Sequence, residues 1–229
     1  MDKLNLISES IFPKPNKVAL VKILPDERVK DFLDGNLYLN TPAHYGEVDR
    51  LDVERFDSED GIDASRHVKE VAIADESGNW VPIGGLINPV TFRTGQSSSV
   101  NVLCMYAMND RAGERFDERN LNFGKVAIYI TNLLEFIHRV KTAATESGLD
   151  VLHGMVSYVN KETHDGPMGP FRKFSKHSHQ NEFRFVFTGG NGSPCRLGVG
   201  DLRDITMLGP STEISQRWNA LQLKESASQ

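Results

Sequence analysis

The sequence predicts a single α+β domain built around a twisted, mainly antiparallel sheet with three or four helices. About ten short runs rich in Val, Ile and aromatic residues have the pattern of strands, whereas three or four segments have helical periodicity. Strands and helices alternate only near the start of the chain, which argues against a doubly wound parallel sheet. No repeat or linker divides the 229 residues. We therefore expect one domain over 1–229, with an extended lead-in at 1–16 and a frayed tail at 222–229.

Four elements are predicted in the first 48 residues: a strand at 17–24, a helix at 25–33, a strand at 36–40 and a helix at 43–48. Pro25 suits the first turn of a helix and Gly35 suits a helix end. Thr41 followed by Pro42 is typical of a second helix start. The acidic stretch 49–66 has no apolar period and predicts an exposed loop, whose role as a lid or a plain insertion the sequence leaves open.

The rest of the chain is predicted to be rich in strands, at 68–73, 80–83, 100–108, 124–130, 154–159, 182–187, 196–199 and 204–208. The Gly-containing connection 75–79 predicts a hairpin, and the run VNVLCMYAM at 100–108 is apolar enough for a central strand. Apolar residues at three- and four-residue spacing predict a helix that begins at Thr131 or Asn132 and ends at Gly148. A last helix is predicted over 212–221.

The composition is that of an ordinary globular protein, with 39% hydrophobic and 25% charged residues and a formal net charge of −5. This balance argues against a chain whose whole surface attracts nucleic acid or membrane, although it is compatible with a local basic face. The two cysteines form no disulfide framework. The N-terminus lacks a signal-peptide pattern, and no apolar run is long enough to span a bilayer. We therefore expect a cytoplasmic protein with no membrane partner.

The densest group of chemically active side chains lies in residues 171–184, FRKFSKHSHQNEFR. In a strand at 182–187, Glu182 and Arg184 share one face and the Phe residues between them share the other, which must face the core. An acid and a base beside a cationic segment predict a cleft for a small anionic ligand. The same residues also fit a solvated strand face with an ion pair beside a basic surface loop.

No metal is expected. His177, His179 and Glu182 do not have the spacing of a known compact metal site. The acidic segment 57–61 lacks the closing bidentate Glu of a calcium loop. The Gly-rich segment 189–192 has neither the Lys nor the following helix of a phosphate-binding loop, so a hairpin loop is predicted there.

Several short motifs resemble those of a group of uncharacterised bacterial and phage proteins. The opening FLDGNLYLNT at 32–41 has the Gly-x-Leu-Tyr pattern of that group, and it is followed by Tyr45 and by an acidic loop at 57–61. The motif VLCMY at 102–106 and the closing QNEFR at 180–184, with Phe174 and Lys176 before it, are also similar. This resemblance covers most of the chain and implies a shared fold more than a shared function.

A second resemblance is to the ADP-ribosyltransferase superfamily. Gln180-Asn-Glu182 is similar to its Gln/Glu-x-Glu signature, which implies NAD as cofactor, Glu182 as the catalytic carboxylate and Gln180 as the acceptor-side residue. The resemblance places further side chains around NAD: Arg172, Lys176, Arg184, Tyr38, Thr41 and Tyr45. The chain departs from the pattern because its first strand has no clear His or Arg, and Lys22 is the nearest cation there.

Two functions stay open at this point. The first is an NAD-dependent, ADP-ribosyltransferase-like enzyme. The alternative is a non-enzymatic binding module of a phage–host conflict system that recognises a nucleotide, nucleic acid or partner protein. In that module Glu182 orients Arg184, and contacts come from the basic and aromatic residues Phe171, Arg172, Lys173, Phe174 and Lys176. A metal-dependent nuclease is a third reading, with no recognisable metal pair to support it.

Overall fold

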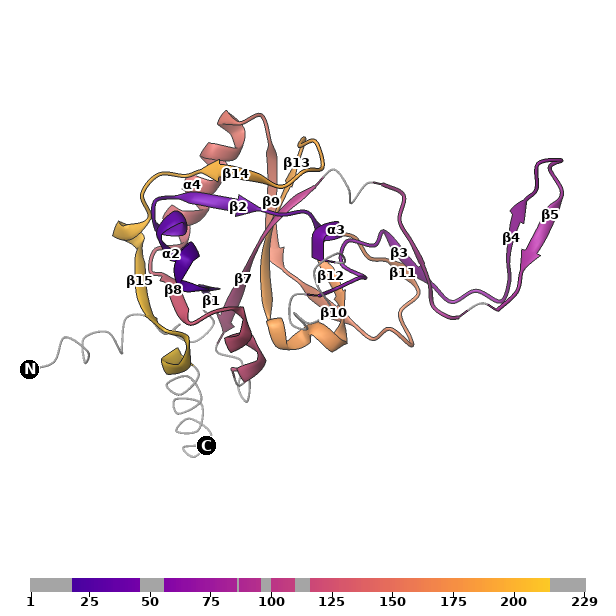
Figure 1. Cartoon of the computed structure of the whole chain (residues 1–229), viewed down its shortest axis with the longest axis horizontal. Helices are drawn as coiled ribbons and strands as arrows, with labels where there is room; N and C mark the ends of the chain where they lie inside the picture. The colour runs from indigo at the N-terminus through magenta and orange to yellow at the C-terminus, as the bar shows by residue number, and fades with distance from the viewer. Residues whose placement is uncertain (1–17, 46–55, 86, 96–99, 110–115, 215–229) are drawn as a thin grey trace, which may run out of the picture.

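A computed structural model describes residues 18–45, 56–85, 87–95, 100–109 and 116–214. Its body is a six-stranded sheet in the order β15-β8-β1-β7-β13-β9 (Figure 1), and every neighbouring pair in it is antiparallel. The strands are β1 (Val18–Leu24), β7 (Asn101–Asn109), β8 (Val126–Ile130), β9 (Asp150–Met155), β13 (Glu182–Thr188) and β15 (Thr206–Pro210). The α+β class and the mainly antiparallel sheet are as predicted.

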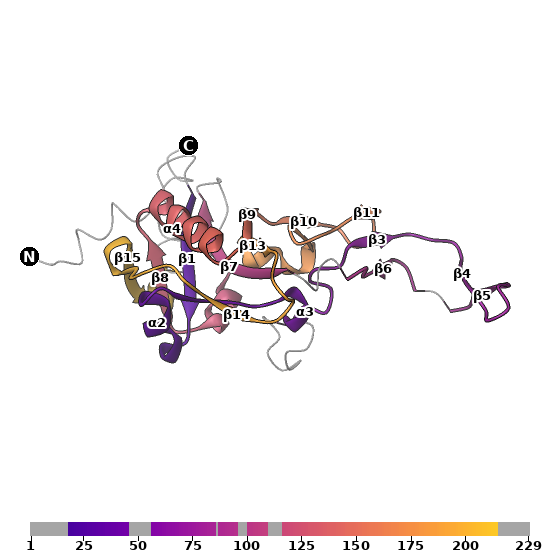
Figure 2. The same cartoon turned by 90° about the horizontal axis from the view of Figure 1, so that it is seen from above.

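Helix α4 (Leu133–Glu146) packs along this sheet (Figure 2). Its N-cap is Asn132, whose side chain accepts a hydrogen bond from the backbone N–H of Glu135 at 3.1 Å. The buried ring of Phe136 lies between Phe32 and Phe185, at centroid distances of 6.4 and 5.8 Å. The main hydrophobic core therefore forms between α4, the preceding helix α2 (Asp26–Leu33) and the Phe face of β13.

Smaller elements surround the body. Among them are the short α-helices α2 and α3 (Pro42–Tyr45). The 3-10 helices are η2 (Glu118–Phe123), η3 (Ser175–Gln180) and η4 (Arg203–Ile205). The small sheets pair β2 (Asn36–Leu39) with β14 (Cys195–Gly198), β10 (Ser157–Val159) with β12 (Arg172–Phe174), and β3 (Ala64–Arg66) with β6 (Val90–Phe92) and β11 (Gly166–Pro167). The β10–β12 pair is parallel. These elements bring the acidic loop at 57–61 and the basic segment at 171–184 to the end of the main sheet.

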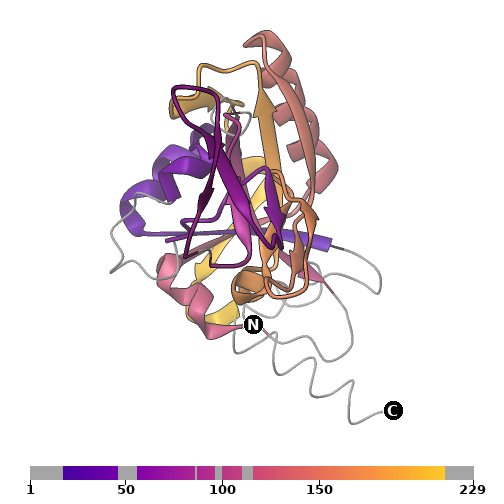
Figure 3. The same ribbon diagram turned by 90° about the vertical axis from the view of Figure 1, so that its right-hand side faces the viewer.

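A two-stranded hairpin of β4 (Val71–Ala74) and β5 (Trp80–Ile83) stands away from the body (Figures 1 and 2) and points toward the viewer in Figure 3. We call it the arm. Its turn is built by Asp75, whose carboxylate accepts hydrogen bonds from the backbone N–H groups of Ser77 and Asn79 at 2.9 and 2.8 Å. The hairpin predicted from the sequence is therefore present, although its first strand begins three residues later than expected.

The structure corrects the exposed-loop prediction for 49–66. Residues 49–55 lie outside the described ranges, but Asp57 and Asp60 are buried and 64–66 form strand β3. They are buried because two buried cations, described below, require carboxylate partners. Predicted strand 154–159 is divided between β9 and β10, which join different sheets. Predicted strand 204–208 begins as η4 and becomes β15 at Thr206.

Other predictions are only partly covered by the described residues. Of the helix predicted at 43–48, the described part is α3, and of the helix predicted at 212–221, residues 211–214 are helical. The predicted lead-in 1–16 and tail 222–229 lie outside the described ranges. Cys104 and Cys195 are free thiols. None of the helices in the described ranges combines the length and apolar character of a membrane-spanning segment.

Replacing Phe136 tests the packing of α4 on the sheet. Phe136→Ala removes a fully buried ring and leaves a cavity, so we expect the free energy of unfolding to fall by about 3–5 kcal/mol. The matched control on the same helix is Leu134→Ala, because Leu134 is 81% exposed and its loss should cost about 0.5 kcal/mol or less. The free energy of unfolding of both variants is measured by urea denaturation. Equal losses in the two variants would contradict this packing.

Candidate functional site

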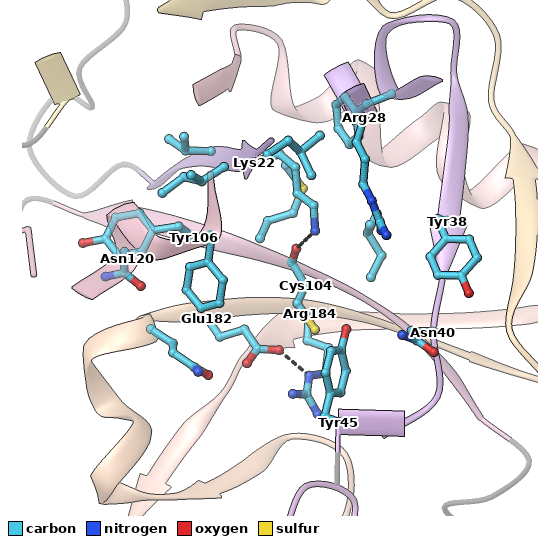
Figure 4. A pocket seen from close by; sticks show the side chains of 18 of the residues that line it. Lys22, Arg28, Tyr38, Asn40, Tyr45, Cys104, Tyr106, Asn120, Glu182 and Arg184 are labelled. Atoms are coloured by element: carbon cyan, nitrogen blue, oxygen red, sulfur yellow. Dashed lines mark hydrogen bonds and ion pairs between the residues drawn. The ribbon is translucent and has the colours of Figure 1, made fainter. Parts of the chain in front are cut away.

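A cavity of about 640 Å³ opens beside the main sheet, lined by residues of β1, β7 and β13 and of α2, β2 and α3 (Figure 4). Its volume lies within the roughly 300–1,000 Å³ range of small-molecule sites. Five of the residues predicted for the NAD site line it: Gln180, Glu182, Arg184, Tyr38 and Tyr45. The fold therefore gathers side chains from both ends of the sequence around one space.

At one end of the cavity lies Arg184, whose side chain is 0% exposed. Its guanidinium donates two hydrogen bonds to the carboxylate of Asp60 at 2.8 and 2.9 Å and one to Glu182 Oε1 at 2.5 Å. A further bond at 2.8 Å goes to the carbonyl oxygen of Pro170. A buried guanidinium needs such partners because an unpaired buried charge is costly. Arg184 thus joins β13 to the acidic loop.

Lys173 is the second buried cation, and it lies among the same carboxylates. Its Nζ is 3.2 Å from Asp57, 3.6 Å from Asp60 and 3.5 Å from Glu182. It also donates a hydrogen bond to the side-chain oxygen of Gln180 at 2.8 Å. Three carboxylates therefore surround two cations, and we call this group of five residues (Asp57, Asp60, Lys173, Glu182, Arg184) the buried ionic network. His177 Nε2 lies 3.3 Å from Asp57 at its margin.

The ionic network decides the charge state of Glu182. Burial raises the pKa of this carboxyl, but the charges of Arg184 and Lys173 outweigh burial and lower the pKa to about 2. Burial likewise raises the pKa of Asp57, but the nearby side chains of His177 and Lys173 outweigh burial and hold this pKa well below its usual range. At neutral pH Glu182 is therefore a carboxylate. It can stabilise a positive charge in the cavity, but it holds no proton to donate.

Local structure explains why Gln180 and Glu182 face the cavity together. Helix η3 ends at Asn181, whose φ of 36° is left-handed, and this residue turns the chain into β13. Asn181 exchanges backbone and side-chain hydrogen bonds with Ala107 on β7, at 2.8 and 2.7 Å. The backbone N–H of Glu182 donates to the hydroxyl of Tyr158 at 3.0 Å. Strand alternation then places Arg184 on the same face as Glu182, as predicted.

The other wall of the cavity is cationic and aromatic (Figure 4). Lys22 extends from β1 and donates a hydrogen bond to the carbonyl oxygen of Cys104 at 2.6 Å. The guanidinium of Arg28, on α2, lies 5.9 Å from the ring centroid of Tyr38, a distance that suits a cation–π contact. Among the described residues no carboxylate forms an ion pair with Arg28. Arg196 also lines the wall and pairs with Asp31 at 2.9 Å.

The structure does not bring every predicted site residue to the cavity. Arg172 is exposed and donates to the carbonyl oxygen of Pro167, and Lys176 is an exposed partner of Glu59 at 2.7 Å. Thr41 is buried but does not line the cavity. Instead, the cavity is lined by Lys22, Arg28 and Arg196, which were not among the residues predicted to surround NAD.

Sequence reasoning missed Asp60 as a site residue and did not single out Arg28. One signal was available for Asp60. An Arg in the middle of a core strand requires a buried carboxylate, and the run DSED at 57–60 is a dense group of carboxylates far along the sequence. The position of Arg28 depends on how α2 packs, and no local pattern records that.

The thiol of Cys104 lines the cavity but is not activated. Burial raises its pKa to about 12, so it stays protonated at neutral pH and is a poor nucleophile. Within the described ranges no group of His, Cys, Asp or Glu is arranged to hold a metal ion. Comparison with models of known protein families, with curated proteins and with solved structures found no match. The two resemblances drawn from short motifs therefore stay predictions.

Removing the central cation tests the buried ionic network. Arg184→Met leaves Asp60 and Glu182 buried with less counter-charge, so we expect the free energy of unfolding to fall by about 3–5 kcal/mol. The control is Arg66→Met, because the Arg66–Asp165 pair is 48% and 47% exposed and should contribute about 1 kcal/mol or less. Chemical denaturation of both variants measures the two losses in free energy of unfolding. A cost at Arg184 no larger than at Arg66 would refute the network's role.

The lowered pKa of Glu182 also predicts a dependence of stability on pH. A carboxyl whose pKa is lower in the folded state stabilises the fold above its unfolded pKa, near 4.5, and loses this contribution as the pH falls toward about 2. The free energy of unfolding of the wild type should therefore decrease from about pH 5 downward. In Glu182→Gln the decrease should be smaller. Urea titrations at several pH values measure both slopes, and identical slopes would argue against the assignment.

Proposed function

We propose that the chain binds a nucleotide in this cavity. The observation that carries the proposal is the combination, on one wall, of Lys22, Arg28 and Arg196 with the ring of Tyr38. Lysine and arginine side chains attract phosphate groups, and an aromatic ring beside them offers a stacking surface for a base. Arg196 pairs with Asp31, whereas no carboxylate among the described residues forms an ion pair with Arg28.

A more specific function, ADP-ribosyl transfer from NAD, is favoured by the placement of Gln180 and Glu182 in the same cavity. In this reaction the bond between the nicotinamide nitrogen and the ribose carbon breaks, and its electron pair leaves with nicotinamide. A lone pair on the acceptor forms the new bond, and the acceptor loses its proton to water. The carboxylate of Glu182 would stabilise the positive charge that develops on the ribose. Because its pKa is about 2, its role is electrostatic.

The non-enzymatic module has its own supporting observation. Glu182 Oε1 accepts a hydrogen bond from Arg184 at 2.5 Å, and Oε2 lies 3.5 Å from Lys173. This is the arrangement expected if Glu182 orients Arg184 for binding. The two functions share the nucleotide site and differ in turnover, so an assay of bond cleavage separates them. We propose a cytoplasmic location for either one, in accord with the two free thiols.

Binding is tested with purified protein by thermal shift and calorimetry against NAD, ADP and short RNA. A nucleotide at 100 times its dissociation constant should stabilise the wild type by about 2.7 kcal/mol. Arg28→Ala should weaken nucleotide binding about tenfold, because it removes one cation and the contact to Tyr38. Arg66→Ala, which changes a cation outside the cavity, should bind like the wild type. The proposal fails if no nucleotide binds, or if both variants bind equally.

Turnover is tested by measuring nicotinamide release from NAD. If the chain is a transferase, Glu182→Gln should retain NAD binding and lose turnover by about 100-fold or more, since the amide keeps the shape but not the charge. Circular dichroism of the variant confirms that it is folded. Wild-type protein that binds NAD without releasing nicotinamide would overturn the transferase function in favour of the binding module.

A further inference from the structure

One face of β2 supplies polar side chains to the cavity. Leu37 and Leu39 of this strand are buried in the main core, whereas its other two positions are exposed. The same alternation places Asn40, which follows the strand, on the side of Asn36 and Tyr38. All three of these polar residues line the cavity, so this side of β2 faces the space in which we propose that a nucleotide binds.

The side chain of Asn40 has a fixed orientation. Its backbone N–H and carbonyl group are both hydrogen-bonded to Val102 of β7, at 3.2 and 2.7 Å. Its Oδ1 accepts a hydrogen bond from the backbone N–H of Thr41 at 3.0 Å. Because an N–H group can only donate, the amide oxygen must face Thr41 and the NH2 group must face away from it. Figure 4 shows this nitrogen on the cavity side of the amide.

The NH2 group of Asn40 has no hydrogen-bond acceptor among the described residues. The residue is only 8% exposed, so bulk water does not replace the missing partner over most of its surface. Buried polar groups in proteins are nearly always hydrogen-bonded, and leaving a donor without an acceptor is unfavourable. A buried donor that lines a cavity therefore indicates a ligand with an acceptor atom at this place.

Arg28 borders the same part of the cavity. Its guanidinium lies 5.9 Å from the ring centroid of Tyr38, and it has no carboxylate partner in the described part of the chain. Side chains two residues apart on one face of a strand, such as Tyr38 and Asn40, are about 7 Å apart. Arg196 stands opposite Tyr38 in the β2–β14 register and adds a second guanidinium there. An acceptor at this place is therefore expected to carry negative charge.

We propose that Asn40 and Arg28 together bind a phosphate group of the nucleotide. The NH2 group of Asn40 and the guanidinium of Arg28 donate hydrogen bonds to its oxygens, and Arg28 balances its charge. The phosphate lies away from Glu182, because that side chain is ionised and like charges repel. This inference rests on the proposed function. It adds the residue that recognises the phosphate and the part of the cavity in which the phosphate lies.

Asn40→Asp tests the assignment by calorimetry with ADP. Aspartate keeps an oxygen that accepts from Thr41, but it exchanges the NH2 group for a charged oxygen that repels phosphate. We therefore expect ADP to bind about tenfold to 100-fold more weakly. The matched control is Asn191→Asp, because Asn191 is exposed, does not line the cavity and likewise accepts from a backbone N–H, that of Ser193 at 3.0 Å. It should bind ADP like the wild type.

A second variant and a second probe complete the test. Asn40→Ala removes the donor without adding charge, so it should weaken ADP binding about tenfold, and it replaces Asn40→Asp if that variant does not fold. Inorganic pyrophosphate has neither base nor ribose. It should displace ADP from the wild type, and the Asn40 variants should weaken it by the same factor as ADP.

The outcomes separate this inference from the proposed function. If ADP does not bind to the wild type, the proposed function fails and this inference fails with it. If ADP binds to the wild type, three results overturn the assignment of Asn40 alone. These are equal ADP affinity in the wild type and the Asn40 variants, an equal loss in Asn191→Asp, and pyrophosphate that does not displace ADP or is unaffected by the Asn40 variants.

Discussion

The contact on which the candidate site depends is the buried pairing of Arg184 with Asp60 and Glu182. A guanidinium with 0% exposure in the middle of a core strand is tolerated only if carboxylates meet it with good geometry. Asp60 supplies a bidentate partner from 124 residues away in the chain, so the pairing fixes the acidic loop against the main sheet. Lys173 extends the same pairing to Asp57 and Gln180.

This pairing also shapes the cavity. Gln180 accepts a hydrogen bond from Lys173 and Glu182 accepts one from Arg184, so both side chains are fixed by partners and Glu182 is ionised. The facing wall is made by side chains of β1, α2 and β2, which the hydrophobic core around Phe136 positions. Core packing and buried charges thus serve one purpose, because each sets one wall of the space in which we propose that a nucleotide binds.

Much of the fold follows from sequence pattern, because its long elements are local. The apolar run of β7, the helical period of α4 and the alternating Phe residues of β13 each identify an element without tertiary information. Short strands such as β3, β6 and β12 were missed because three residues carry too little pattern, and tertiary pairing decides their conformation. The division of 154–159 between two sheets likewise has no local signal.

The candidate site was predictable in part for the same reason. Alternation along β13 was enough to place Glu182 and Arg184 on one face. Gln180 was named only through the resemblance of Gln180-Asn-Glu182 to a Gln/Glu-x-Glu signature. Their burial was not predictable, since it depends on Asp60 arriving from a distant loop whose composition is typical of a solvated surface. Arg172 and Lys176 looked equivalent to Lys173 in sequence, yet only Lys173 of β12 points into the network.

A crystal structure of the protein soaked with NAD tests the central claim most directly. We expect the ligand in the cavity, with its phosphate oxygens within hydrogen-bond distance of Arg28 or Lys22 and a ring against Tyr38. An empty cavity at a concentration that saturates the protein in solution, or NAD bound on another surface, would contradict the account.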